Sequence, residues 1–387
     1  MACVSRWALC GPLAVLALTV APPATRADLT GFHQTNLVTS ATDSDLINPW
    51  GLVSSPTGSP IWVSDNGTGH STLYDGFTGA KQARVVNIRS ITGGGATSPP
   101  TGVVFNGDMA NFLGDRFIFA TEDGQLNGWQ AALDTTAAVR AAIPGAVYKG
   151  LAINALTNDT LYAANFANGN VDVFDSAYAL TGPLFTDPNL PAGYAPFNVQ
   201  FLGGKLYVTF ALKKPGTDDD DPGQGRGIID VVDPVTHAFT RLATGSAAGG
   251  TATSLDSPWG LALAPASFGP FGGDLLVGNF GDGKINAFDP TTGAFLGTLS
   301  DPNGNPLVNP GLWGLMFGTG GNAGGDPDAL YFTAGGTNED TGVLGRINAV
   351  PEPGSFVLLG LGGAAVLGGC LRRTGPSGRG GGISNAG

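Results

Sequence analysis

A short motif related to Pro-Trp-Gly-Leu recurs through most of this 387-residue chain. Successive copies are separated by roughly 50 residues, and the longest interval contains an insertion at residues 213–227. Internal repetition at such a period constrains a fold strongly, because each repeat must be one supersecondary unit that packs against the next. The six copies are Pro49-Trp50-Gly51-Leu52, Pro100-Thr101-Gly102-Val103, Tyr148-Lys149-Gly150-Leu151, Pro196-Phe197-Asn198-Val199, Pro258-Trp259-Gly260-Leu261 and Leu312-Trp313-Gly314-Leu315.

Each copy of the motif is followed by two more apolar segments, which a turn rich in Gly, Asn or Asp separates. Alternating apolar positions and Asx-Gly turns are typical of β-hairpins. Four strands in each repeat predict an all-β fold, a single six-bladed β-propeller over residues 28–350. The last repeat has segments for only three strands, so the spare strand at 32–38 is expected to complete it and close the ring.

Charge and cysteine content narrow the classes of function. The chain carries 30 acidic and 18 basic residues, a net charge of −12. Such a surface repels phosphate backbones, so we expect no nucleic-acid partner, whereas divalent cations and neutral sugars remain candidate ligands. The three cysteines, Cys3, Cys10 and Cys370, all lie in terminal segments, which excludes thiol catalysis and thiolate metal sites in the body.

Both ends of the chain have the pattern of targeting segments. Arg6 precedes an apolar stretch, and a small-residue site ends at Ala27, which predicts a secretory signal peptide over residues 1–27. At the other end, an uncharged apolar run at 356–371 is predicted to enter the inner membrane as a transmembrane segment. Two arginines follow it and are expected to hold the Gly-rich tail, residues 374–387, in the cytoplasm.

Residues 351–373 resemble the PEP-CTERM sorting signal, in which Pro-Glu-Pro, a membrane segment and a basic cluster follow one another. The resemblance implies recognition and cleavage by an exosortase. The expected path is export, transient anchoring in the inner membrane, and then the cell surface or the extracellular space. The Gly-rich extension departs from the usual pattern, and an ordinary membrane anchor is the alternative. The residues that carry the signal are Pro351, Glu352, Pro353, Arg372 and Arg373.

The body resembles, along nearly its whole length, an uncharacterised family of exported proteins associated with PEP-CTERM tails. The family has no established activity, so the resemblance implies export and a propeller-like body but no particular ligand. The matching stretches are residues 48–52, 62–69, 120–124, 161–166, 190–198 and 277–283.

One face of the predicted propeller gathers polar side chains. The loop that leads into each innermost strand and the loop between the second and third strands emerge on that face, around tryptophans near the start of the innermost strands. We therefore predict a ligand-binding face there. Its residues are Trp50, Asp65, Asn66, His70, Glu122, Asp123, Asn165, Trp259, Asn279, Asp282 and Trp313.

Two other interpretations of these residues stay open. Glu122, Asn165 and Asn279 offer the carboxylate and amide oxygens that Ca²⁺ prefers, which makes calcium a candidate cofactor. Alternatively, Asn and Asp occupy these loops because they tolerate positive φ and hydrogen-bond their own backbone. The acidic run at 218–221 is interpreted as a solvated loop. The aspartates predicted to be turn residues are Asp75, Asp175, Asp233 and Asp289.

The sequence contains no nucleophile signature, and His70 is the only histidine expected on the candidate face, so no catalytic residue is assigned. The favoured function is a monomeric binding or scaffold protein of the cell surface or extracellular matrix, linked to exopolysaccharide or biofilm. Its partner would be a polysaccharide or an envelope protein, with membrane contact only through the C-terminal segment. The alternative is a calcium-dependent hydrolase or lyase of the lactonase-like propeller type, which rests on analogy of fold.

Overall fold

Twenty-four β-strands and four short 3-10 helices make up the computed structural model over the residues that it describes, 29–183 and 187–351. The predicted signal peptide, and the sorting tail from Glu352 onward, lie outside these residues. No helix in the described part of the chain is long and apolar enough to cross a membrane. The 3-10 helices are η1 (Phe112–Gly114), η2 (Ala131–Leu133), η3 (Ser246–Ala248) and η4 (Gly269–Phe271).

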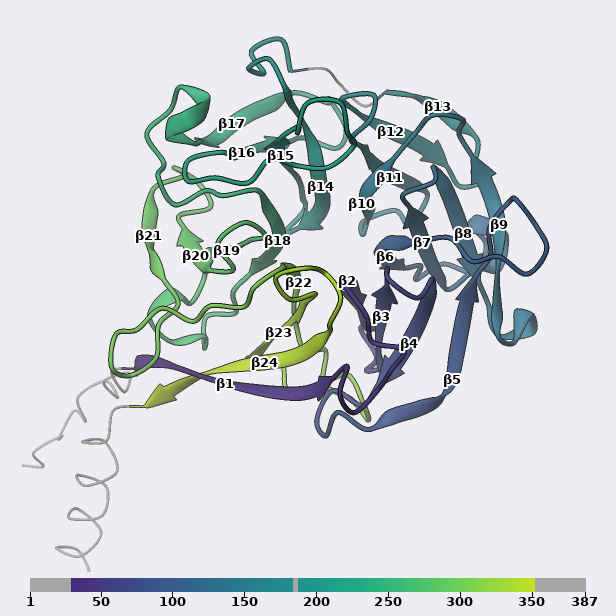
Figure 1. Ribbon diagram of the computed structural model, residues 1–387, viewed down its shortest axis with the longest axis horizontal. Helices are drawn as coiled ribbons and strands as arrows, with labels where there is room; N and C mark the ends of the chain where they lie inside the picture. Colours follow the sequence, from purple (N-terminus) through teal and green to yellow (C-terminus); the bar gives the residue numbers. More distant parts are fainter. Residues whose placement is uncertain (1–28, 184–186, 352–387) are drawn as a thin grey trace, which may run out of the picture. The chain divides into compact units, whose positions relative to one another are not determined.

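Four of the five sheets have four antiparallel strands, which in Figure 1 follow one another outward from a central axis. Three of them are formed by consecutive strands. The first has β10 (Tyr148–Ile153), β11 (Thr160–Asn165), β12 (Asn170–Asp175) and β13 (Leu180–Pro183). The second has β14 (Tyr194–Leu202), β15 (Lys205–Leu212), β16 (Ile228–Val232) and β17 (Phe239–Thr244). The third has β18 (Pro258–Leu263), β19 (Leu275–Asn279), β20 (Ile285–Phe288) and β21 (Phe295–Thr298).

The eight-stranded sheet consists of two antiparallel halves with the same four-strand order. The halves are joined where Asn87 and Ile88 of one outer strand run parallel to Thr136 and Ala137 of the other. One half has β2 (Pro49–Val53), β3 (Ile61–Asp65), β4 (His70–Tyr74) and β5 (Lys81–Ile88). The other has β6 (Pro100–Phe105), β7 (Phe117–Thr121), β8 (Gln125–Trp129) and β9 (Thr136–Ala142).

The remaining sheet joins the two ends of the described chain. Its strands are β22 (Leu312–Phe317), β23 (Ala329–Ala334), β24 (Val343–Pro351) and, outermost, β1 (Leu29–Thr39). β1 pairs antiparallel with β24 from Phe32 opposite Ala349 to Thr39 opposite Val343. The prediction that the N-terminal strand closes the ring is therefore confirmed, and the outer edge of β24 is covered.

The six copies of the sequence motif lie on the innermost strands, β2, β6, β10, β14, β18 and β22. The motif glycines let neighbouring innermost strands touch. A Cβ atom on Gly102 would lie 2.4 Å from the backbone nitrogen of Leu151, and one on Gly260 would lie 2.4 Å from the carbonyl oxygen of Trp313. In β14 the motif has Asn198 instead, whose Nδ2 donates to the carbonyl of Trp259 at 2.7 Å.

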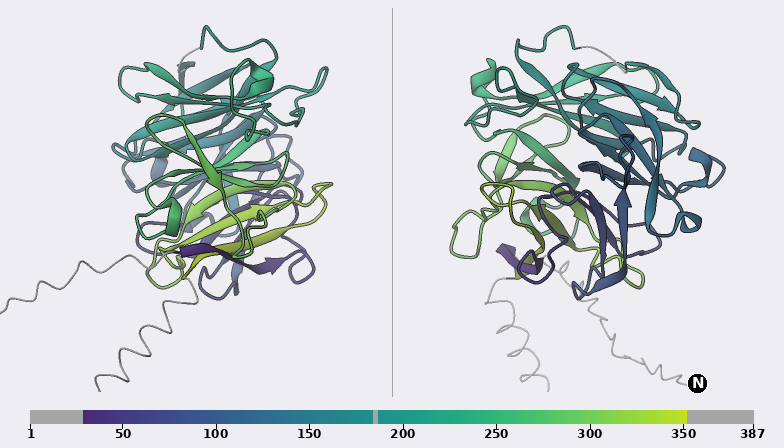
Figure 2. Two further views of the ribbon diagram at one scale, coloured as in Figure 1. Left: turned by 90° about the vertical axis from the view of Figure 1, so that its left-hand side faces the viewer. Right: turned by 45° about the vertical axis from the view of Figure 1, so that its right-hand side comes forward.

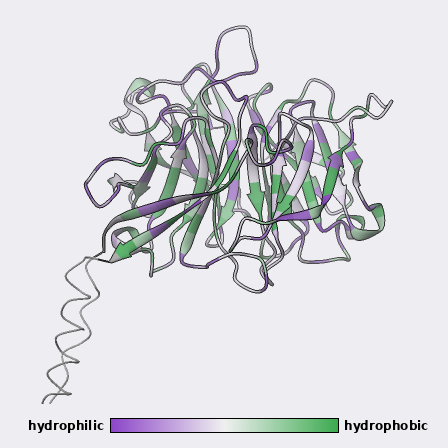
Figure 3. Cartoon of the chain, turned by 60° about the horizontal axis from the view of Figure 1, so that its bottom comes forward, coloured by the Kyte–Doolittle hydropathy of each residue, from purple (hydrophilic) through white to green (hydrophobic). Residues whose placement is uncertain are grey.

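Apolar side chains fill the spaces between neighbouring sheets, so many strands are buried on both faces. Every residue of β3, β7 and β19 is buried. Ile118 and Leu126 pack in one cluster with Leu161 and Phe174 of the next sheet. Burial of each such aliphatic or aromatic side chain stabilises the folded state by about 1.5–3 kcal/mol relative to leaving it exposed. Seen from the side, the loops project from two opposite faces of the ring (Figure 2), and the apolar colour gathers on the strands (Figure 3). This arrangement is a β-propeller.

Candidate functional site

Three tryptophans from three innermost strands meet on the central axis, and we call them the tryptophan plug. The rings of Trp50 and Trp313 stack with centroids 3.6 Å apart, and Trp259 meets both edge-on at 6.1 and 5.7 Å. Phe197 and Phe280 pack against the same cluster. The exposed fractions of Trp50, Trp259 and Trp313 are only 2%, 4% and 1%. The structure thus brings the three predicted tryptophans together, but as a buried layer beneath the predicted ligand-binding face.

A polar layer covers the plug on the predicted ligand-binding face. Nζ of Lys149, on β10, lies 2.6 Å from Oε1 of Glu122 and 5.2 Å from the centre of the Trp50 ring. Lys149 is only 4% exposed, whereas the Glu122 side chain is 27% exposed. A buried ammonium group needs such a partner, because desolvation of an unpaired charge is costly. The pair therefore places one fixed cation at the centre of the face.

Two asparagines connect this ion pair to the opposite side of the face. Asn66 Nδ2 donates to Glu122 Oε2 at 2.9 Å, and Asn48 Nδ2 donates to Glu339 Oε2 at 2.8 Å. Asn48 Oδ1 accepts a hydrogen bond from Trp313 Nε1 at 2.9 Å, so the layer is tied to the plug. Asn48 has a φ of 44°, in the left-handed region that asparagine tolerates. We call Asn48, Asn66, Glu122, Lys149 and Glu339 the central network.

Carboxylates outnumber cations around the central network. Asp219 Oδ1 lies 4.0 Å from Lys149 Nζ, and the Asp219 side chain is 70% exposed. Burial raises the pKa of Glu339, and the charge of Glu122 adds to the effect. Burial also raises the pKa of Asp220 to about 6. The acidic run at 218–221 is therefore solvated at Asp219, as predicted, but its neighbour Asp220 is turned inward.

Four other predicted residues hold their own loops in place. Asp65 is buried, and its Oδ2 accepts hydrogen bonds from the backbone N–H and the hydroxyl of Thr72 at 2.9 and 2.8 Å. Burial raises the pKa of Asp65 well above its usual value. His70 Nδ1 lies 3.4 Å from Asp45 Oδ1. Elsewhere on the face, Asp123 Oδ2 accepts a hydrogen bond from the Ser98 hydroxyl at 2.7 Å, and Asp282 Oδ2 lies 3.0 Å from Lys284 Nζ.

The three residues of the calcium hypothesis have separate partners. Glu122 is bound by Lys149 and Asn66, whereas Asn165 Nδ2 donates to Asp172 Oδ2 at 2.9 Å. Asn279 Nδ2 donates to the carbonyl of Ser254 at 2.8 Å and to Asp282 Oδ1 at 3.0 Å. Within residues 29–183 and 187–351, no group of three or more His, Cys, Asp and Glu side chains has a metal-binding arrangement. The calcium site stays a prediction.

The turn aspartates behave as predicted. Asp75, Asp175, Asp233 and Asp289 each accept two backbone N–H groups of the following turn on one carboxylate oxygen. Sequence reasoning did not include Lys149 among the site residues. The signal was nevertheless present, because lysine stands at the motif position that holds Trp50, Phe197, Trp259 and Trp313 in four other copies.

Comparison with sequence families identifies the C-terminal segment. Residues 349–373 match the PEP-CTERM protein-sorting motif, which confirms the predicted sorting signal. The motif implies export, sorting to the cell surface and processing by an exosortase.

The rest of the chain is similar to proteins of undefined role. The uncharacterized protein L690 of Acanthamoeba polyphaga mimivirus is 33% identical over 302 residues, which cover 72% of this chain and 75% of that protein. The uncharacterized protein R648 of the same virus is 32% identical over 324 residues, which cover 79% of this chain and 76% of that protein.

An auxiliary nutrient binding protein from Bacteroides thetaiotaomicron is similar in structure, with a TM-score of 0.56 over 82% of this chain and 76% of that one. At 12% identity, this last likeness shows the fold alone.

Proposed function

The chain belongs to the family of the uncharacterized mimivirus proteins L690 and R648, and on that premise we propose an exported propeller that binds a ligand without converting it. In this proposal residues 1–27 are a cleaved signal peptide and residues 28–350 form six blades. The repeated four-strand order in both halves of the eight-stranded sheet supports that count. Residues 356–371 anchor the chain in the inner membrane until an exosortase releases it to the cell surface or the matrix.

The observation that carries the binding proposal is the fixed pattern of donors and acceptors over the tryptophan plug. Lys149 is held by Glu122, and Asn66 and Asn48 are held by Glu122 and Glu339. Because these groups already have partners, a ligand meets a prearranged surface and little conformational freedom is lost on binding. Glu122 and Asp219 are still open to solvent and can accept hydrogen bonds.

The charge of this surface indicates the class of ligand. Four carboxylates, Glu122, Asp219, Asp220 and Glu339, surround the single buried Lys149, so an anionic polymer is repelled. A neutral polymer rich in hydroxyl groups can instead donate to these oxygens. With sorting to the cell surface, this favours a neutral exopolysaccharide, with a role in biofilm, over an envelope protein.

The test is calorimetric titration of the protein with neutral exopolysaccharide from the producing cells. Glu122→Gln should weaken binding at least about tenfold, because hydrogen bonds to a charged group contribute about 1.5–3 kcal/mol each. Asp282→Asn is the control, because Asp282 lies outside the central network and should not affect affinity. Equal affinity for all three proteins would contradict the proposal.

Two further measurements on the same samples distinguish the proposed binding function from the alternative, a calcium-dependent hydrolase or lyase. Thermal unfolding is compared in EDTA and in millimolar Ca²⁺, since a ligand at a hundred times its dissociation constant stabilises the native state by about 2.7 kcal/mol. The polysaccharide is then assayed for new reducing ends or unsaturated sugars. Stabilisation by Ca²⁺ that Glu122→Gln, Asn165→Ala and Asn279→Ala abolish, together with cleavage, would replace binding by catalysis.

A further inference from the structure

An apolar well lies in the ring beyond the tryptophan plug, on the side away from the central network. The order of residues along each innermost strand shows this. On β2, Trp50 belongs to the plug and the following Leu52 and Val53 line the well. On β22, Trp313 belongs to the plug and Leu315 and Met316 line the well. The plug therefore closes the inner end of the well and separates it from the polar face.

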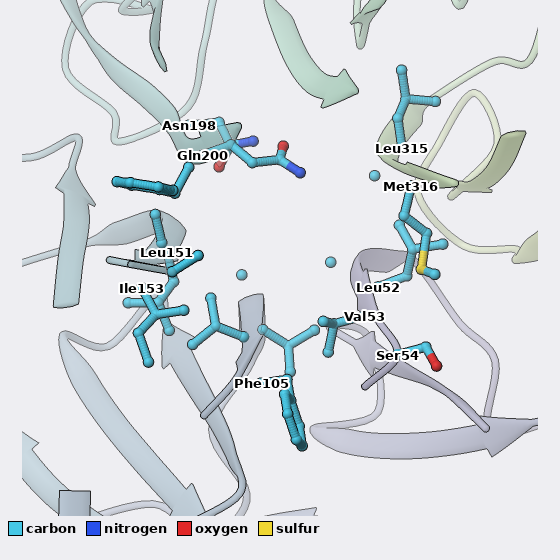
Figure 4. Close-up of a pocket in the computed structure, with 18 of the residues that line it drawn as sticks. Leu52, Val53, Ser54, Phe105, Leu151, Ile153, Asn198, Gln200, Leu315 and Met316 are labelled. Atoms are coloured by element: carbon cyan, nitrogen blue, oxygen red, sulfur yellow. The ribbon is translucent and has the colours of Figure 1, made fainter. Parts of the chain in front are cut away.

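Among the described residues, the side chains that line the well are mainly apolar, and none of them is charged; the polar ones are Ser54, Asn198, Gln200 and Thr319. Its volume is about 280 Å³. At roughly 30 Å³ for each water-sized group, this is space for about nine such groups. Figure 4 shows Leu151 and Ile153 on one side and Leu52 and Met316 on the other, with Phe105 and Val53 below.

One polar side chain of the lining lacks a partner. Ser54 Oγ donates to the carbonyl of Ser59 at 2.6 Å, and Asn198 is bound to the carbonyl of Trp259 and the backbone N–H of Val199. Gln200, half-buried on β14 and drawn beside Asn198 in Figure 4, makes no side-chain hydrogen bond within the described residues. A few polar groups in a mostly apolar pocket orient a small ligand, and the free Gln200 amide can supply one of them.

We propose that the well binds an uncharged, mainly apolar small molecule of about nine heavy atoms with one hydroxyl group, such as a medium-chain alcohol. Its apolar part contacts Val53, Ile153 and Met316, and its hydroxyl group hydrogen-bonds to the Gln200 amide. A charged ligand is disfavoured, because no lining residue would compensate its desolvation. This site is separate from the central network and does not depend on the function proposed for it.

The experiment uses the exported chain, purified without detergent because detergent would fill the well. The protein is photolabelled with an octanol that carries a diazirine, and the labelled residues are mapped by peptide mass spectrometry. Labelling should concentrate on the lining of the well, and straight-chain alcohols should compete. Each added methylene should lower the competing concentration about fourfold, as expected for a buried CH₂, until the well is full and the trend stops. Labelling spread over the surface, or competition without a plateau, would overturn the proposal.

Variants add a second criterion. Met316→Trp fills the well and should abolish labelling there, whereas Val235→Trp, on an exposed turn, is the matched control and should not. Gln200→Leu should still bind octane but lose the preference for octanol over octane. Unchanged labelling of a folded Met316→Trp protein would refute the site. If that variant does not fold, the chain-length series and Gln200→Leu decide the question.

Discussion

Carboxylates of this acidic chain differ in role according to their burial. Asp233 and Asp289 lie in exposed turns, where hydrogen bonds from the following backbone N–H groups lower the pKa of each. Asp230, only three residues before Asp233, is fully buried on β16, and burial raises its pKa to about 6. Arg241 opposes that shift, since its Nε donates to Asp230 Oδ1 at 2.5 Å, but it also pairs with Asp187. The pKa values of Asp230 and Asp233, three residues apart, are therefore shifted in opposite directions.

The variant Asp230→Asn tests the raised pKa of Asp230 through the pH dependence of stability. Because the folded state retains the Asp230 proton at a pH where the unfolded chain releases it, this group's contribution to stability falls as pH rises from about 4 to 6. On going from pH 7 to pH 5, the wild-type protein should gain about 1 kcal/mol in unfolding free energy relative to the variant. Urea unfolding at both pH values measures this. Asp289→Asn is the control and should show no such difference; identical pH profiles for wild type and Asp230→Asn would contradict the assignment.

Among the elements, β1 links the N-terminal end of the described chain to its last sheet. It supplies the outermost strand of the last sheet, and without it β24 would present an unpaired edge. Phe32 of β1 is 2% exposed, with its ring 5.0 Å from Phe268 and 5.9 Å from Phe271 near the η4 helix. β1 thus bonds to one sheet and packs against the next.

A chain that begins at residue 40 should form oligomers or aggregate, because the freed edge of β24 pairs with other molecules. Size-exclusion chromatography with light scattering would show this, and a peptide of residues 29–39 should restore the monomer. Phe32→Ala separates packing from strand pairing: it should lower stability by about 3–5 kcal/mol yet leave the protein monomeric. A stable monomeric chain lacking β1 would show that the strand is dispensable.

At the scale of the whole molecule, the central axis has two chemically different sides. The tryptophan plug separates the charged central network from the uncharged apolar well. The well is lined mainly by the innermost strands, whereas the network combines Lys149 of β10 with residues of the loops before β2 and after β3, β7 and β23. The sorting motif overlaps the end of β24, since the match covers residues 349–373 and β24 runs to Pro351. In the proposed export route, release from the membrane therefore depends on the segment that follows the propeller.

Replacing Pro351, Glu352 and Pro353 with alanine should keep the protein in the inner-membrane fraction, because the exosortase would no longer recognise the motif. Cell fractionation and immunoblotting would measure the released share. Pro234→Ala, in an exposed turn of the propeller that lies outside the sorting motif, serves as the control and should be released like the wild type. Undiminished release of the triple variant would indicate another processing route, whereas retention of the wild type as well would indicate an ordinary membrane anchor.

The sequence by itself determined the features that contiguous residues encode. The repeat of the Pro-Trp-Gly-Leu motif, the spare strand before it, the turn aspartates and the C-terminal motif are all local patterns, and the structure and the family match confirm them. Only the tertiary structure decided which polar side chains are partnered. Lys149 meets Glu122 across 27 residues of the chain and Asn48 meets Glu339 across 291, and both contacts form only when the sheets converge on one axis. The same convergence buries the tryptophans that the sequence predicts on the ligand-binding face, and it leaves an apolar well beyond them.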